Sequence, residues 1–219
     1  MSISRRWRKN ILPHIGNDIV DLKQPDNLKA SMDSRFPKKV LTAAEIEFVQ
    51  NAQNSAQALW SFWACKETAY KVVKKIKPEA SFLPRQWEVC LSPPARHFIE
   101  AIVLVSENQT IYSRLFLNDD YVHCVGSEVV AALDNMICEV IKLPAGNNGG
   151  AEKGHSFLRE CASRKIAQHF HLYSSDLKIE REQIKTELQP PHVLKGDSRL
   201  AIDLSLSHDG RFGAYAFLP

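Results

Sequence analysis

The sequence lacks the features of a membrane-spanning or secreted protein. No stretch approaches the ~20 consecutive apolar residues that cross a bilayer. The first nine residues include four basic ones and are not followed by an apolar segment, which argues against a secretory signal. The five cysteines are scattered among 219 residues, and no two form a C-x-x-C pair. This argues against a zinc site or a disulfide framework. We therefore expect a soluble, cytoplasmic protein with no membrane partner.

The sequence also has little excess charge of either sign. The formal net charge is +3, with 24% charged and 44% hydrophobic residues, which is ordinary for a globular protein of one domain or two small ones. Basic residues cluster only at 5–9 and 74–77. A nucleic-acid binder needs a broader basic face with stacking aromatics, so no nucleic-acid partner is expected. The basic arm at 5–9 is either solvated or helps to dock an acidic partner.

What the sequence does contain is a long amphipathic segment near its centre. Apolar residues recur at intervals of three and four and predict a helix that Pro78 ends. These residues are Leu59, Phe62, Trp63, Ala69, Tyr70, Val73 and Ile76. Glu67 and Lys71 lie one turn apart on the same face, and this spacing has two interpretations. The pair is either a surface ion pair worth a few tenths of a kcal/mol or part of a functional site.

The segments around this helix predict an α+β fold. A strand is expected at 11–22, a polar connection at 24–35, and a helix from the Thr42–Glu45 capping box to about 53. Alternating residues then predict strands at 87–91, 97–106, 110–117 and 121–130. They would form a small antiparallel sheet against the long helix.

The second half of the chain repeats this pattern more briefly. We expect a strand at 137–143, a loop at 145–150, a helix at 156–171, a strand at 177–184 and a closing hairpin at 200–206 and 212–218 around His208. Two similar halves, at 1–134 and 135–219, would place a cleft on a pseudo-twofold axis.

Three short stretches carry a family resemblance. They read Gly16-x-Asp18, Trp63-x-x-Lys66-Glu67-x-x-x-Lys71 and Ser205-x-Ser207-His208. Together they resemble the 4′-phosphopantetheinyl transferase superfamily. The resemblance implies two α/β units, each a small antiparallel sheet packed on a long helix. It also implies Mg²⁺-dependent transfer of phosphopantetheine from coenzyme A to a serine of an acyl or peptidyl carrier protein, with release of 3′,5′-ADP.

The order of these stretches differs from that in the two-unit, surfactin-synthetase-activating type of the family. In that type the Ser-His turn precedes the Asp strand, whereas here it follows. Residues 15–127 resemble the C-terminal half of that type, and residues 137–218 resemble its N-terminal half. The resemblance therefore implies a circularly permuted two-unit transferase, acting as a monomer.

The resemblance also assigns roles to the acids and lysines of the first half. Asp18 and Glu67 would hold Mg²⁺, a cation that prefers oxygen ligands. Glu67 would also be the general base for the carrier serine. Lys71 would contact the phosphates of coenzyme A, and Lys66 is either a neighbouring electrostatic contributor to coenzyme A binding or a solvated lysine.

The second half would supply the remaining contacts to coenzyme A. Ser207 and His208 would bind phosphate oxygen, with His208 counted among the catalytic residues. The arginine near the 3′-phosphate would be Arg164, with Arg159 and Lys165 as alternatives on the same predicted helix.

Two positions depart from the family pattern. Val20 stands where larger members have a second metal acid, and alternation in a strand directs the next acid, Asp21, to the opposite face. A water ligand would take the place of the missing acid. Residues 189–191 read Gln-Pro-Pro where many members have Gly-Lys-Pro, so a basic phosphate contact is lost. The alternative function is a non-catalytic module that binds coenzyme A or a carrier protein.

Overall fold

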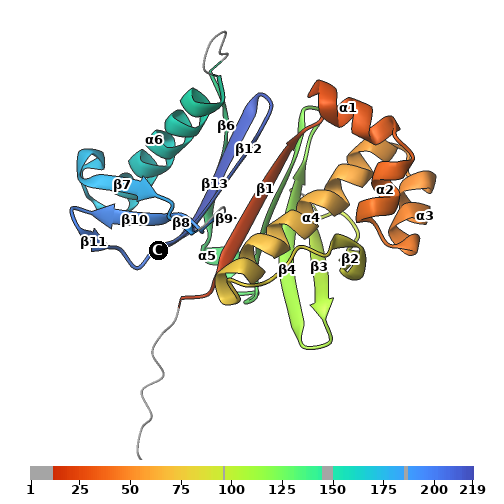
Figure 1. Cartoon of the computed structure of the whole chain (residues 1–219), viewed down its shortest axis with the longest axis horizontal. Coiled ribbons are helices and arrows are strands. Elements are labelled where there is room, and N and C mark those ends of the chain that lie inside the picture. The colour runs from red at the N-terminus through yellow and green to blue at the C-terminus, as the bar shows by residue number, and fades with distance from the viewer. Residues whose placement is uncertain (1–11, 96, 145–149, 185–186) are drawn as a thin grey trace, which may run out of the picture.

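Two long helices, α4 (Ser55–Ile76) and α6 (Gly150–Phe170), each cover an antiparallel sheet (Figure 1). This arrangement is seen in a computed structural model that describes residues 12–95, 97–144, 150–184 and 187–219. The basic arm at 5–9 and most of the predicted loop at 145–150 lie outside the described residues. The predicted α+β fold, with antiparallel sheets packed on long helices, is confirmed.

The larger sheet has five antiparallel strands in the order β1-β5-β4-β3-β2. In chain order these are β1 (Ile15–Asp21), β2 (Glu88–Leu91), β3 (Ile99–Ser106), β4 (Gln109–Leu117) and β5 (Tyr121–Ser127). All five were predicted, although several are shorter than the sequence suggested. Helix α4 buries one face against this sheet because its apolar residues recur with the helical period.

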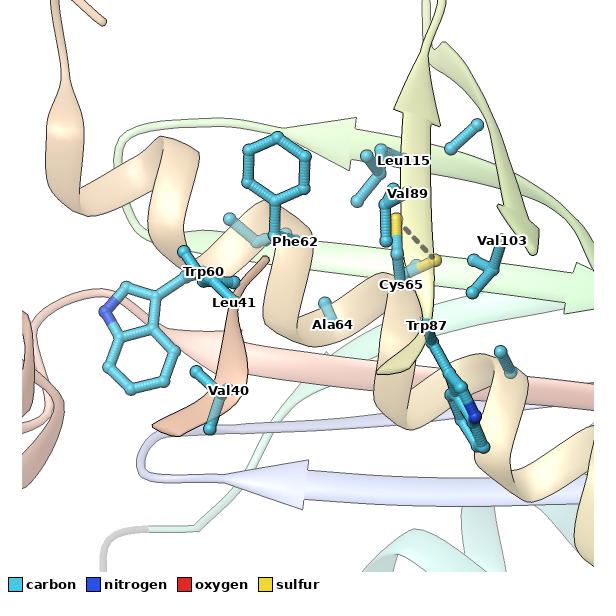
Figure 2. Packing of buried hydrophobic residues seen from close by; sticks show 14 of the residues in the cluster. Val40, Leu41, Trp60, Phe62, Ala64, Cys65, Trp87, Val89, Val103 and Leu115 are labelled. Atoms are coloured by element: carbon cyan, nitrogen blue, oxygen red, sulfur yellow. Dashed lines mark hydrogen bonds between the residues drawn. The ribbon is translucent and has the colours of Figure 1, made fainter. Parts of the chain in front are cut away.

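Figure 2 shows the interior between α4 and the sheet. Phe62 and Cys65 of α4 pack among Val89, Val103 and Leu115 of three different strands. Full burial of such side chains contributes about 1.5–3 kcal/mol each. This packing fixes the position of α4, and thereby the side chains on its other face.

Three short helices precede α4: α1 (Pro25–Met32), α2 (Arg35–Val40) and α3 (Ala43–Asn51). The prediction of a polar connection at 24–35 is wrong, because most of this segment forms α1. Pro25 stands in the first turn, where a missing N–H costs nothing. Helix α1 buries no residue, and its large apolar residues, Leu28 and Met32, are only two and are both exposed, so the apolar pattern is too short to predict a helix. The capping box at α3 is confirmed: Glu45 N–H donates to Thr42 Oγ1 at 3.3 Å, and Thr42 N–H donates to Glu45 Oε2 at 2.8 Å.

The second half has a three-stranded sheet in the order β12-β13-β6. Its strands are β6 (Ile137–Lys142), β12 (Asp203–Asp209) and β13 (Phe212–Leu218). A second three-stranded sheet has the order β11-β10-β7, and a two-stranded sheet is formed by β8 and β9. These strands are β7 (Leu177–Glu180), β8 (Gln183–Ile184), β9 (Glu187–Leu188), β10 (His192–Lys195) and β11 (Ser198–Arg199). The predicted strand at 177–184 is thus divided between β7 and β8, and α6 begins six residues earlier than predicted.

The turn of the β12–β13 hairpin is tighter than the sequence suggested. Strand β12 continues through Asp209, so Ser207 and His208 lie on the strand itself. Gly210 takes a left-handed backbone with φ of +49°, which favours glycine. A Cβ at Gly210 would lie 2.5 Å from the Asp21 carboxylate, so the turn also needs glycine for close packing against β1.

Strand β1 of the larger sheet lies beside β12 and β13 of the smaller one (Figure 1). The two sheets share a strand arrangement. In each half of the chain, the last strand (β5 or β13) lies between the first strand (β1 or β6) and the strand with which it forms a hairpin (β4 or β12). Polar contacts between β1 and β12 join the sheets, and the candidate site lies along this line.

Candidate active site

Strand β1 can approach helix α4 closely because Gly16 has no side chain. A Cβ at Gly16 would lie only 2.2 Å from the backbone carbonyl oxygen of Thr68 in α4. The same helix residue limits β5, where a Cβ at Gly126 would lie 2.9 Å from Thr68 Cγ2. The close approach of β1 brings Asp18 within reach of Lys71 on α4.

Lys71 joins helix α4 to strand β1. Its Nζ donates to Asp18 Oδ1 at 2.8 Å and to the carbonyl oxygen of Asn17 at 2.7 Å. Burial raises the pKa of Asp18, and the Lys71 charge opposes that rise. A substrate that withdraws Lys71 would therefore leave Asp18 in need of another positive partner.

Glu67 lies one helical turn before Lys71 and is half-buried. Within the described part of the chain, no hydrogen bond or ion pair to its carboxylate is formed. Burial, together with the negative charge of Asp18, raises the pKa of Glu67 to about 7. A carboxylate with such a pKa can exchange protons near neutral pH.

Asp18, Glu67 and His208 face a common cavity of about 190 Å³. Asn27 of α1 and Asp209 of β12 also contribute to its lining. The structure thus brings together one predicted residue from each of the three family-like stretches, although they are far apart in the sequence. This gathering is the central feature of the candidate site.

His208 is exposed, and its Nε2 lies 2.6 Å from Nε2 of His155 on α6. Ser207 is buried and donates its hydroxyl proton to Asn17 Oδ1. Asp209 accepts from the backbone N–H of Asp21 at 2.8 Å and from the side-chain amide of Asn27. The end of β12 is therefore held against β1 from both sides of His208.

Lys66 is not brought to this cavity. Its side chain is fully buried, and its Nζ donates to Glu45 Oε2 at 2.6 Å and to the carbonyl oxygens of Val40 and Pro84 at 3.0 and 2.9 Å. Successive residues on a helix point about 100° apart, so the neighbour of Glu67 faces the core. The prediction that Lys66 contributes to coenzyme A binding is corrected accordingly, and its alternative, a solvated lysine, is wrong.

Arg164 also lies away from the cavity residues. It is exposed on α6, where its Nη2 is 3.8 Å from Glu160 Oε1, one turn away. Arg159, one of the alternatives, instead lines a cavity of about 110 Å³ together with Ser207 and His208. The structure therefore favours Arg159 over Arg164 as the α6 arginine nearest to the Ser-His pair.

Arg181 is a cation that the sequence analysis did not single out. It lines the 110 Å³ cavity and also a neighbouring cavity of about 330 Å³, to which Lys71 and Lys74 contribute. Its Nη2 donates to Leu206 O at 3.4 Å, and its buried Nε has no partner among the described residues. Burial and the nearby charge of Arg159 lower the pKa of Arg181. No sequence pattern marked it, because it follows the end of the short strand β7, outside the three family-like stretches.

Comparison with known families decides the assignment. The sequence model described as the 4′-phosphopantetheinyl transferase superfamily matches residues 14–132, more than half of the chain. The chain belongs to the 4′-phosphopantetheinyl transferase superfamily. No curated protein sequence gives a match. Transferases of this superfamily move phosphopantetheine, with coenzyme A as donor and a carrier protein as acceptor.

The superfamily match covers Asp18, Glu67 and Lys71 but ends before the Ser-His stretch. Val20, which stands at the position of the expected second metal-binding acid, is buried in the core. Asp21 faces away from Asp18 and is bound by Arg211 through its N–H and guanidinium groups at 2.7–2.9 Å. Burial acts to raise the pKa of Asp21, but these bonds hold that pKa below its usual range.

The described residues contain neither a preformed cluster of metal ligands nor a membrane-spanning helix. No group of three or more histidine, cysteine or acidic side chains is arranged among them to hold a metal ion. None of the described helices is long and apolar enough to span a bilayer.

Proposed function

We propose that this transferase moves 4′-phosphopantetheine from coenzyme A to a serine hydroxyl of an acyl or peptidyl carrier protein, in a Mg²⁺-dependent reaction that releases 3′,5′-ADP. The observation that carries the proposal is the shared cavity of Asp18, Glu67 and His208, with Lys71 bound to Asp18. In this reaction the serine oxygen bonds to the phosphorus that carries pantetheine, and the phosphoanhydride bond to 3′,5′-ADP breaks.

The acids of the cavity fit a magnesium ion. Asp18 and Glu67 offer two hard oxygen donors, and Mg²⁺ is commonly held by one or two carboxylates together with waters and substrate phosphates. A preformed group of three protein ligands is therefore not required. When bound, the ion would neutralise charge on the pyrophosphate as the phosphoanhydride oxygen leaves.

Glu67 is the proposed general base. Its carboxylate has no partner in the described part of the chain, and its pKa of about 7 suits acceptance of the serine proton. Lys71 would leave Asp18 and donate to a phosphate oxygen of coenzyme A, since an ammonium can exchange one anionic partner for another at little cost.

Cations along the two neighbouring cavities would hold the rest of coenzyme A. Arg159 lies close enough for its charge to lower the pKa of Arg181, and no carboxylate among the described residues pairs with either arginine. Two adjacent arginines without a counter-charge favour binding of a phosphate dianion. His208 lines the 110 Å³ cavity together with Arg159 and Arg181. The 330 Å³ cavity, with apolar walls from Tyr70, Leu188 and Pro190, has a volume suited to the adenosine portion.

The carrier would dock over α1. Leu28 and Met32 are 43% and 85% exposed there, and Asn27 of the same helix lines the Asp18–Glu67 cavity. Lys38 and Lys39 of α2 are exposed nearby. An apolar patch beside basic residues suits an acidic carrier, and its continuity with the cavity would bring the acceptor serine to Glu67.

We also infer that the chain consists of two related units, 1–134 and 135–219, in circularly permuted order, and that it acts as a monomer. The shared strand order of the two sheets supports this inference. So does the proximity of the start of β1 to the end of β13: Ile15 and Leu218 belong to one apolar cluster, and Asp203, opposite Leu218 in β12–β13, accepts from Ile15 N–H at 3.2 Å. The end of β13 thus lies where a direct connection into β1 would begin.

The test is incubation of the protein with coenzyme A, Mg²⁺ and a panel of apo carrier proteins, followed by mass spectrometry. A mass increase equal to one phosphopantetheine group is expected, and it should disappear when Mg²⁺ is chelated. Coenzyme A binding without transfer to any carrier would instead support the alternative, a non-catalytic module of the same fold.

A further inference from the structure

Asn17 is a fully buried polar residue at the centre of the contact between β1 and β12. Its backbone N–H donates to Ser205 Oγ at 2.9 Å, its side-chain Nδ2 donates to Ser205 O at 2.6 Å, and its Oδ1 accepts from Ser207 Oγ. Both serines of the Ser-x-Ser-His stretch therefore bind the same asparagine. A buried amide needs such partners, because burial of an unpaired donor or acceptor removes its hydrogen bonds to water without replacing them.

The backbone of Asn17 extends this connection to the helix. Its carbonyl oxygen accepts from Lys71 Nζ, and the adjacent Asp18 accepts from the same ammonium. Continuous hydrogen bonds thus run from Lys71 through Asn17 to Ser207, the residue before His208. The groups proposed to bind metal and phosphate are linked along this path.

Backbone hydrogen bonds do not align β1 with β12 around Asn17. They belong to different sheets and share no backbone ladder. Other polar contacts lie toward the ends: Ile15 N–H donates to Asp203, Lys75 of α4 donates to the carbonyl oxygens of Ile15 and Leu204, and Asp209 accepts from Asp21 N–H. In the middle, next to Asp18 and His208, the backbone N–H and the side chain of Asn17 make three hydrogen bonds to β12.

We propose that Asn17 is a positioning residue that aligns the Asp18–Glu67–Lys71 side of the site with the His208 side, and that Ser207 acts through Asn17 instead of binding phosphate. This inference rests on the proposed function for its catalytic meaning. Reacting groups on opposite walls must be held closely, since a displacement of about 1 Å can lower a rate on the order of 100-fold.

The experiment compares Asn17→Leu, Ser207→Ala and the double variant. Each single change should lower kcat about 10- to 100-fold while leaving the Kd for coenzyme A within about threefold. The double variant should be close to the worse single variant, because both changes break one connection. Ser61→Ala is the matched control, since it removes a buried hydroxyl that donates to a carbonyl, Gln57 O, at 2.8 Å, away from β12.

The outcomes separate three roles. A phosphate-binding role for Ser207 predicts weaker coenzyme A binding in Ser207→Ala but not in Asn17→Leu, and this result would overturn the proposal. A merely structural role predicts a lower Tm with normal kcat in the folded protein, as expected for Ser61→Ala, and it would overturn the proposal equally. If Asn17→Leu does not fold, Ser205→Ala with Ser207→Ala removes the two hydroxyl contacts to Asn17 from the other strand, at its backbone N–H and at Oδ1.

Failure of the proposed function is recognised separately. If the wild-type protein modifies no carrier, the transfer reaction is refuted. The Asn17 connection is then tested by hydrogen exchange. Ser205→Ala should speed exchange of the backbone N–H of Asn17 at least tenfold, and Ser61→Ala should not. Unchanged exchange in Ser205→Ala would refute the connection itself.

Discussion

The ammonium of Lys71 pairs with Asp18, a residue 53 positions earlier, at 2.8 Å. The sequence placed Lys71 beside Glu67 on one helical face, where a local ion pair was the simpler interpretation. The structure instead joins Lys71 to β1 and leaves Glu67 facing the cavity. Each carboxylate thereby has a different environment, which is how two acids in one site acquire different roles.

Replacing Glu67 with glutamine should lower transfer at least about 100-fold with the fold intact. The substitution removes the proposed base and one proposed metal ligand while keeping the shape of the side chain. Steady-state kinetics with apo carrier, together with circular dichroism, checks this result. The exposed Glu47→Gln serves as the control. Near-normal turnover in Glu67→Gln would exclude it as the base.

Lys66→Met should destabilise the protein by about 3–5 kcal/mol, because Glu45 would remain buried without its ion-pair partner. Urea unfolding measures the loss, and the double variant with Glu45→Gln should recover part of it. The Kd for coenzyme A should not change in the folded protein. Weaker coenzyme A binding would restore the original assignment of Lys66 to the ligand site.

Met32→Asp should raise the KM for an acidic carrier about tenfold and leave the KM for coenzyme A unchanged. A charge placed in the centre of the proposed docking patch disfavours both its apolar contact and its attraction for acidic residues. Tyr173→Asp is the control, since Tyr173 is a 79% exposed aromatic residue on the second half of the chain. Equal effects of the two changes would argue against docking on α1.

His123 should make stability depend on pH. Burial and the Lys71 charge lower the pKa of His123 to about 3, and its Nε2 has no hydrogen-bond partner among the described residues. Between about pH 3 and the unfolded value of about 6.5 the unfolded chain binds a proton that the folded chain does not. The free energy of unfolding therefore rises with pH in this window, and above about pH 6.5 His123 contributes no further change.

Removing His123 should flatten that dependence. In His123→Phe, the slope of unfolding free energy against pH should decrease by up to about 1.4 kcal/mol per pH unit below pH 6.5. Urea unfolding from pH 4 to 7 measures the slope. Exposed His97→Phe should leave it unchanged. Parallel curves for wild type and His123→Phe would show that the folded protein protonates His123 normally.

Joining the two chain ends and opening the chain between Asn135 and Met136 should give a folded protein that binds coenzyme A with affinity within a few-fold of wild type. The ends of β1 and β13 already lie together, and the opening falls between α5 (Ala132–Asn135) and β6. A variant opened inside α4 is the control and should not fold. Failure of the first variant would argue against two units in permuted order.

Local patterns predicted most of the elements. The strands of the first sheet, helix α4 and the Thr42 capping box follow from periodicity and short-range chemistry. Helix α1 was missed because it buries no side chain and only Leu28 and Met32, four residues apart, mark an apolar face. The β12–β13 turn was placed too early because alternation alone does not show where a glycine with positive φ reverses the chain.

The candidate site was predicted less evenly. Asp18, Glu67 and His208 were identified from short stretches and do line one cavity. Lys66 was misplaced because motif position does not tell which side of a helix is buried. Arg181 and Asn17 were missed because their importance depends on neighbours more than 20 residues away in sequence.

Residue type and short spacing are enough to predict the superfamily, the α+β class and the acid and imidazole groups of the candidate site. Which of these groups face one another depends on how distant segments pack. Burial sends Lys66 into the core, the absence of a Gly16 side chain lets β1 approach α4, and paired hydrogen bonds from Asn17 align two strands separated by nearly the whole chain.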